Sequence, residues 1–131
     1  MLYIVSWNTS ETKKIYQATK NSEMLMEYLE KRLLQEDIAK LISEQPTPNR
    51  GYGVLYYYYS NQPRKRLLSS APRRDHDHIH VVIFNGILKQ EQLRKEQFDL
   101  GNEVATPDIK VHTKEEIDKL IRLINQNLSR A

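Results

Sequence analysis

Residues 75–86 read DHDHIHVVIFNG and constrain the fold more than any other part of the chain. Alternate residues of a β-strand point to opposite faces of a sheet. His76, His78 and His80 therefore share one face, and the aliphatic side chains of this stretch share the other. The aliphatic face is formed by Ile79, Val81 and Ile83. This alternation predicts a strand at 78–84, with helices packed on its aliphatic face and the histidines on an uncovered face.

Length and composition limit the class of protein. The chain has 131 residues and is expected to form a single domain over 1–131. It has no cysteine, which excludes disulfides and thiolate zinc sites and fits a reducing compartment. Its apolar start is too short for a membrane span and lacks the features of a secretory signal. We expect a cytoplasmic protein with no membrane partner, in which His, carboxylate, amide or water would bind any metal.

The remaining patterns predict the order of the elements. Apolar residues at helical spacing follow the candidate caps Asn21 and Ser22, and residues 113–116 form a capping box before another apolar stripe. The expected elements are a strand at 2–8, a helix from 21 or 22 to before 45, strands at 52–59 and 78–84, a helix at 87–100, a strand at 103–112 interrupted at Pro107, and a helix from 113. This order predicts an α+β fold with a ferredoxin-like antiparallel sheet (strand-helix-strand-strand-helix-strand), helices on one face and an added C-terminal helix.

A basic segment precedes the histidines. Residues 60–74 read SNQPRKRLLSSAPRR, with five basic residues, no acidic residue and two prolines. Because proline interrupts regular structure, we expect a loop here. Such a loop is usually only solvated, but beside a histidine cluster it is suited to binding a phosphate backbone. The predicted nucleic-acid contacts are Arg64, Lys65, Arg66, Arg73 and Arg74.

The strand expected at 52–59 ends in four consecutive tyrosines. Tyr56 and Tyr58 lie on one face of such a strand, and Tyr57 and Tyr59 lie on the other. Aromatic side chains favour sheets, so all four can simply pack a half-exposed sheet. If Tyr56 and Tyr58 share the face of the histidines, they can instead stack unpaired bases, at roughly 1 to 3 kcal/mol per base. Both interpretations stay open.

The spacing of the histidines allows metal binding. Two imidazoles two residues apart on a strand can share one divalent ion, although exposed polar residues on a half-solvated strand are the plainer alternative. The candidates for a third ligand are Asp75, His76, Glu103 and Asn127. Lys114 and Lys119 are either phosphate contacts or exposed charges on a helix, and His112 is expected at the surface.

The sequence His78-Ile79-His80, followed by Val81-Val82-Ile83, resembles the His-hydrophobic-His motif of the HUH endonuclease superfamily. That superfamily includes replication initiators, relaxases and single-strand transposases. The resemblance implies that His78 and His80 help to bind Mg²⁺ or Mn²⁺ on a central strand of the sheet. It also implies that a tyrosine attacks a DNA phosphate, leaving a 5′-phosphotyrosine and a free 3′-hydroxyl. By analogy with small members, it implies a homodimer from a virus, plasmid or mobile element.

The sequence does not define the nucleophile. No tyrosine follows Tyr59, and Leu123 or Leu120 stands where the resemblance would place one. Three alternatives stay open. The nucleophile is Tyr3 or one of Tyr56 to Tyr59, or a tyrosine has been replaced at Phe98, or the chain has kept the fold and lost tyrosine chemistry.

These patterns favour a metal-dependent endonuclease or strand transferase that acts on single-stranded DNA and initiates replication or transposition. One alternative is a non-catalytic protein that binds single-stranded nucleic acid on the same sheet face. Another is a metal phosphoesterase for RNA or a small nucleotide, which forms no covalent intermediate. A plain structural or interaction domain is the last alternative.

Overall fold

The computed structural model describes residues 6–16, 18–47, 52–73, 76–101 and 106–128. Its elements are η1 (Trp7–Thr9), α1 (Glu11–Tyr16), α2 (Lys20–Gln35), β1 (Ala39–Thr47), β2 (Tyr52–Tyr59), β3 (Gln62–Pro72), β4 (Ile79–Ile83), α3 (Gln90–Lys95), β5 (Asp99–Leu100), β6 (Asp108–Val111) and α4 (Lys114–Leu128). The six strands form one sheet in the order β1-β2-β3-β4-β6-β5, and every neighbouring pair is antiparallel. The predicted α+β class and antiparallel sheet are therefore confirmed.

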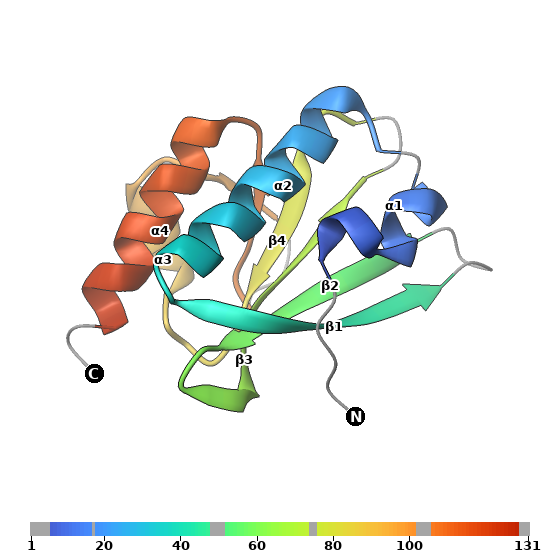
Figure 1. The fold of residues 1–131 in the computed structure, drawn as a ribbon. Helices are drawn as coiled ribbons and strands as arrows, with labels where there is room; N and C mark the ends of the chain where they lie inside the picture. Colours follow the sequence, from blue (N-terminus) through green and yellow to red (C-terminus); the bar gives the residue numbers. More distant parts are fainter. Residues whose placement is uncertain (1–5, 17, 48–51, 74–75, 102–105, 129–131) are drawn as a thin grey trace.

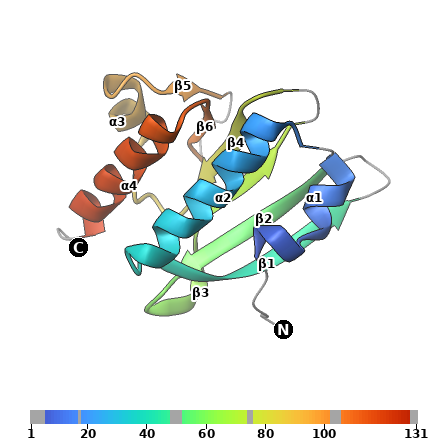
Figure 2. The ribbon, with the colours of Figure 1, turned by 45° about the horizontal axis from the view of Figure 1, so that its top comes forward.

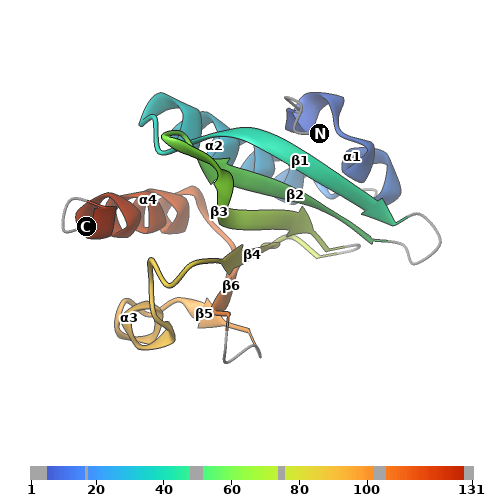
Figure 3. The same ribbon diagram turned by 90° about the horizontal axis from the view of Figure 1, so that it is seen from below.

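The fold has two layers. Helices α1, α2 and α4 lie over one face of the sheet (Figure 1), and α2 and α4 run side by side across it (Figure 2). The hydroxyl of Tyr28 on α2 donates to Asp118 on α4 at 2.6 Å, which joins the two helices. Helix α3 packs beside the edge strand β5 (Figure 3).

Strand β4 has the alternation that the sequence predicts. Ile79, Val81 and Ile83 are 0% exposed, whereas His80 and Val82 are partly exposed. The buried side chains share one core with apolar residues of α2 and α4. These are Leu25, Met26, Leu29, Leu33, Ile117, Leu120, Ile121 and Ile124. Since β4 lies between β3 and β6, it is an interior strand whose histidine side faces away from the helices.

Helix α2 differs from the prediction at both ends. Its cap is Thr19, whose side chain accepts a hydrogen bond from the Ser22 amide at 3.1 Å. The predicted continuation to residue 44 is wrong, because the helix ends at Gln35 and Asp37 has a φ of 52°. The amides of Asp37 and Ile38 donate back to carbonyls of the last helical turn at 3.2 and 3.1 Å. This Schellman-type closure stops the helix and directs the chain into β1.

Two further predictions are wrong where the structure describes the chain. Residues 7 and 8 of the strand predicted at 2–8 belong to the 3-10 helix η1, which is capped by Ser6; residues 1–5 lie outside the described residues. Strand β3 occupies most of the loop predicted at 60–74, because Leu67 and Leu68 are buried and β3 pairs with both β2 and β4. Pro72 is the last residue of β3, so the strand ends at a residue that has no amide hydrogen to donate.

The helix predicted at 87–100 is shorter in the structure, and the strand predicted at 103–112 is not formed at residues 106 and 107; residues 103–105 lie outside the described residues. Helix α3 ends at Lys95, and the left-handed residue Gln97 (φ 65°) turns the chain into β5. Strand β6 begins only at Asp108, after Pro107, which has no amide hydrogen for the ladder. The Pro107 carbonyl still accepts a hydrogen bond from the Ile83 amide at 2.9 Å.

The ferredoxin-like connectivity is not confirmed. Strands β1 to β4 are consecutive both in the chain and in the sheet, so they form a meander, and within the described residues no helix lies between them. The predicted C-terminal helix is present as α4, on the covered face with α1 and α2 (Figure 1). Among the described residues, no helix is long and apolar enough to cross a membrane.

Candidate active site on the open face of the sheet

Strand register brings polar side chains together on the face opposite the helices. Val82 pairs with Ser69 of β3 and with Asp108 of β6, and Ser69 pairs in turn with Tyr56 of β2. Residues paired in this way share one side of a sheet. His80 precedes Val82 by two positions and lies on the same side. The open face is the side that carries Tyr56, Ser69, His80, Val82 and Asp108.

His80 lies between a guanidinium group and a buried carboxylate. Nη2 of Arg73 is 2.8 Å from His80 Nδ1, and Oδ2 of Asp108 is 2.6 Å from His80 Nε2. A guanidinium group can only donate, so Nδ1 accepts and the remaining proton lies on Nε2, directed at the carboxylate. Asp108 is only 3% exposed. The interior strand thus holds an oriented imidazole with a cation on one side and an anion on the other.

Gly101 makes room for the Asp108 carboxylate. A Cβ atom at this position would lie 1.7 Å from Asp108 Oδ2. The Gly101 amide also donates to the Asp108 carbonyl at 2.9 Å, which holds the two backbones together. Any side chain at Gly101 would therefore push the carboxylate away from His80.

Gly101→Ala is expected to break the contact between His80 and Asp108 and to shift the ring resonances of His80. Because the overlap involves a side chain that is almost fully buried, we also expect a loss of about 1–3 kcal/mol in unfolding free energy. NMR of the histidine rings and urea unfolding measure the two effects. Gly86→Ala is the matched control: Gly86 has a φ of 65°, but a Cβ atom there would meet no atom within 4 Å, so the change should cost about 1 kcal/mol and leave the His80 signals unchanged. Unchanged His80 signals in Gly101→Ala would contradict this account.

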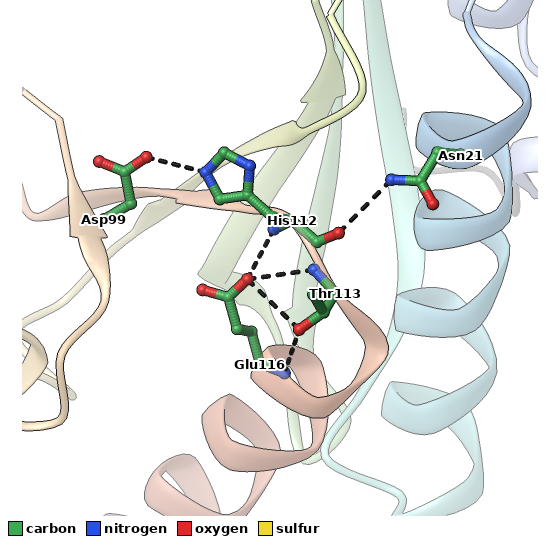
Figure 4. Close-up of polar contacts among 5 residues, drawn as sticks. All are labelled: Asn21, Asp99, His112, Thr113 and Glu116. Atoms are coloured by element: carbon green, nitrogen blue, oxygen red, sulfur yellow. Dashed lines mark hydrogen bonds and ion pairs between the residues drawn. The ribbon is translucent and has the colours of Figure 1, made fainter.

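A cluster of three histidines lies beside His80. The ring centroid of His78 is 5.2 Å from that of His76 and 5.2 Å from that of His112. Nε2 of His112 is 2.8 Å from an oxygen of Asp99 (Figure 4). His78 therefore faces two other histidines, whereas His80 faces Arg73 and Asp108.

The starts of two helices fix the backbone of this cluster. Asn21 of α2 donates to the carbonyls of Asp77 and His112, at 2.6 and 3.4 Å. Glu116 of α4 accepts hydrogen bonds from the amides of His112 and Thr113, at 2.8 and 3.1 Å (Figure 4). The Thr113 hydroxyl in turn accepts from the Glu116 amide at 3.2 Å, so the predicted capping box is confirmed.

Acidic pH is expected to destabilise the wild type more than the variant His78→Gln. Burial lowers the pKa of His78 from its usual 6.5, and the positive charges of His112, His76 and Lys110 lower it further, against an opposing effect of Asp99. The unfolded chain then binds this proton more tightly than the folded chain does. The contribution of His78 to unfolding free energy therefore falls as the pH drops from 6.5 toward the lower folded pKa. Urea unfolding above and below this range tests the prediction, which fails if both proteins lose stability equally.

The structure does not gather the predicted metal ligands into one group. Within the described segments, no group of three His, Asp or Glu side chains is placed to hold a metal ion. Asn127 lies near the far end of α4, roughly 20 Å along the helix from Lys114, and its amide donates to the Leu123 carbonyl at 2.7 Å. His76 is exposed and touches only the His78 ring among the aromatic contacts. Asp75 and Glu103 lie outside the described residues.

The predicted nucleophile positions lie in different places. Tyr56 is on the open face, but β3 lies between it and β4, a separation of roughly 10 Å. Tyr58 is 7% exposed, and Phe98 is 6% exposed and belongs to the core. Lys119 Nζ lies 5.0 Å from the Phe98 ring. Tyr3 lies outside the described residues.

The predicted basic contacts separate into two groups. Arg73 contacts His80, whereas Arg64, Lys65 and Arg66 lie near the turn between β2 and β3. Arg74 lies outside the described residues. The alternative phosphate contacts on α4 have other partners: Lys114 lies over the Tyr28 ring at 5.2 Å, and Lys119 donates to the Glu96 carbonyl at 2.5 Å.

Sequence reasoning missed Asp108 and Gly101. Asp108 directly follows Pro107, and the end of a proline-interrupted segment was its only local signal. His112 is exposed as predicted, but its contact with the His78 ring was not foreseen.

No family model matches the chain, and comparisons with curated proteins and with solved structures also found no match.

Proposed function

We propose that the protein is a metal-dependent endonuclease for single-stranded DNA. His80 and Asp108 form the site at which the DNA is cut. The observation that carries the proposal is the placement of His80 between Arg73 and Asp108 on the open face, 2.8 and 2.6 Å away. Imidazole, carboxylate and guanidinium groups at one point provide a metal ligand pair and a phosphate contact. The resemblance of the HIH segment to the HUH motif agrees with this assignment.

The donor atoms fit Mg²⁺ or Mn²⁺. A divalent cation held by His80 Nε2 and Asp108 Oδ2 would take the place of the proton between these two atoms. The imidazole proton would then lie on Nδ1, so Arg73 would donate to a substrate phosphate in place of His80. Mg²⁺ commonly uses one or two protein carboxylates and takes its other ligands from water and substrate phosphate. A third protein ligand is therefore not required. When bound, the ion would stabilise the negative charge that develops on the phosphate.

Residues of the chain supply the other parts of the proposed reaction. The planar guanidinium group of Arg73 can donate two hydrogen bonds to a phosphate. His78, two residues before His80 on the same face, has a lowered pKa because of its burial and neighbouring positive charges. Its imidazole is therefore neutral near pH 7 and can accept a proton from an attacking water.

Water is the proposed nucleophile, because β3 separates Tyr56 from β4, and Tyr58 and Phe98 are buried. Covalent attack by a tyrosine, which the resemblance implies, is the second candidate. Non-catalytic binding of single-stranded nucleic acid is a further candidate, which the exposed Arg64 and Lys65 near the turn between β2 and β3 favour. The implied homodimer stays a prediction, which light scattering on the purified protein tests.

Labelled single-stranded DNA incubated with Mn²⁺ or EDTA tests the proposal. We expect cleavage with Mn²⁺ only and no band that carries both protein and DNA on a denaturing gel. A covalent band would support the tyrosine mechanism instead. If the protein bound but did not cut any DNA in a pool of different sequences, it would be a binding protein. That result would contradict the proposal.

A further inference from the structure

A groove opens at the end of the β2–β3 hairpin, away from the histidines. It has a volume of about 730 Å³ and is lined by Gln62, Arg64, Lys65, Arg66, Phe84 and Asn85. Phe84 follows β4 directly and is four residues from His80, a separation of roughly 13 Å along an extended strand. Both side chains are on the side of β4 that is only partly buried. The groove and the candidate active site therefore lie along one strand.

The groove is positively charged. Three of the residues that line it, Arg64, Lys65 and Arg66, carry a positive charge. No acidic residue lines it, and among the described residues no carboxylate forms an ion pair with Arg64, Lys65 or Arg66. An anionic ligand would therefore meet uncompensated positive charge.

The same groove presents flat groups. The guanidinium carbon of Arg66 lies 4.1 Å from the ring centroid of Tyr56 and 5.8 Å from that of Phe84. The two rings are themselves 6.1 Å apart. Arg66 thus rests on Tyr56, and both Arg66 and Phe84 line the groove. Guanidinium planes and aromatic rings are the groups on which unpaired bases stack.

The walls of the groove are held in place. The side-chain amide of Asn85 donates to the Arg66 carbonyl at 2.6 Å, and the Phe84 amide donates to the Leu67 carbonyl at 2.9 Å. Asn85 and Gly86 have φ values of 59° and 65°, typical of a tight turn. A preformed site loses less conformational entropy when a ligand binds.

We propose that this groove binds one unpaired nucleobase of single-stranded DNA, stacked on Arg66 and Phe84, with the neighbouring phosphates on Arg64 and Lys65. The side-chain amide of Gln62 and the side-chain oxygen of Asn85 can contact the edge of the base. The inference rests on the proposed function, since it makes the groove the site that fixes which phosphate reaches His80. A planar ligand with an attached anion fits this lining better than an acidic peptide, which has nothing to stack.

Fluorescence anisotropy in EDTA tests the groove without any cleavage. The probe is a fluorescent oligodeoxynucleotide, and a set of probes carries an abasic spacer at each position in turn. Phe84→Leu keeps an apolar side chain but removes the ring, and we expect it to weaken binding roughly 5- to 150-fold. Arg66→Lys keeps the charge, loses the plane and should also weaken binding. An abasic spacer at one position of the probe should weaken binding by the wild type to the same extent. The same spacer should not weaken binding by Phe84→Leu any further.

Matched variants separate stacking from charge. Arg64→Ala should lower the slope of log affinity against log salt by about 0.7, the value for one phosphate contact on a single strand. Lys31→Ala, an exposed charge on α2, should leave both affinity and slope unchanged. Melting curves of Phe84→Leu and Arg66→Lys confirm that both variants are folded.

Three results would overturn the inference: equal affinity of Phe84→Leu and wild type, no effect of an abasic spacer at any position, or equal affinity for duplex and single-stranded DNA. Failure of the proposed function has a different signature. In that case Mn²⁺ gives no cleavage, while the dependence of binding on Phe84 and Arg66 persists in EDTA.

Discussion

Replacement of His80 by alanine is expected to lower the rate of Mn²⁺-dependent cleavage of single-stranded DNA by at least about 100-fold. The variant loses the imidazole that contacts both Arg73 and Asp108, and with it one of the two proposed metal ligands. Binding in EDTA should change little, because the basic groove at the β2–β3 hairpin is intact. Single-turnover cleavage and anisotropy measure the two effects separately.

Asp108→Asn provides a second test of the same site. The amide keeps the shape of the side chain and removes the charge, so the loss of cleavage should match that of His80→Ala. His112→Ala is the control, because it removes a ring beside His78 but no contact of His80. Its effect on cleavage should be clearly smaller. If His80→Ala cleaved DNA at the rate of the wild type, the reaction would have to occur elsewhere on the protein.

Glu30→Ala is expected to cause a large loss of stability, although Glu30 is a polar residue outside the site. Glu30 is 8% exposed, and its carboxylate accepts hydrogen bonds from the Trp7 amide at 3.0 Å, the Ser6 hydroxyl at 2.6 Å and the Tyr57 hydroxyl at 3.0 Å. Alanine leaves these donors without a partner. We expect a loss of about 2–4 kcal/mol in unfolding free energy, measured by urea denaturation, and a fall in Tm of roughly 10 °C.

Two variants make this stability prediction specific. Glu27→Ala removes an exposed carboxylate one turn earlier on α2 and should change the unfolding free energy by less than about 0.5 kcal/mol. Tyr57→Phe removes only one of the three hydrogen bonds and should have an intermediate effect. Equal effects of Glu27→Ala and Glu30→Ala would contradict the account.

Local patterns predicted the strand β4 and the helix α4 because their signals come from neighbouring residues. The alternation from His78 to Phe84 gave the covered and open sides of β4, and the capping box of Thr113 gave the start of α4. Strand β1 was missed because the spacing of Ile38, Leu41 and Ile42 suits a helix as well as a sheet. The left-handed conformation of Asp37 decides between them, and an aspartate is not a usual signal for the end of a helix.

The candidate site could be predicted only in part for a related reason. His80 and Arg73 stood out by residue type, and they are seven positions apart. Asp108 is 28 positions from His80 and reaches it only through the register of β4 with β6. Gly101 matters only because of how close it lies to Asp108. Long-range pairing of this kind has no counterpart in local spacing.

In the basic segment, residues 60–74, the sequence identified the charged residues but not their secondary structure. Its residues were correctly singled out as a cluster of positive charge, but its prolines suggested a loop. Burial of Leu67 and Leu68 makes it the strand β3, which separates the basic residues into two groups. Arg64, Lys65 and Arg66 lie at one end of β3, and Arg73 follows its other end.

Paramagnetic broadening by Mn²⁺ tests most directly whether His80 and Asp108 hold the ion. The measurement is an NMR titration of the isotope-labelled protein with Mn²⁺, with and without single-stranded DNA. We expect the signals of His80 and Asp108 to broaden first, and Asp108→Asn to abolish the effect at His80. Earliest broadening in the cluster of His76, His78 and His112, or no broadening of His80 even with DNA present, would contradict this expectation.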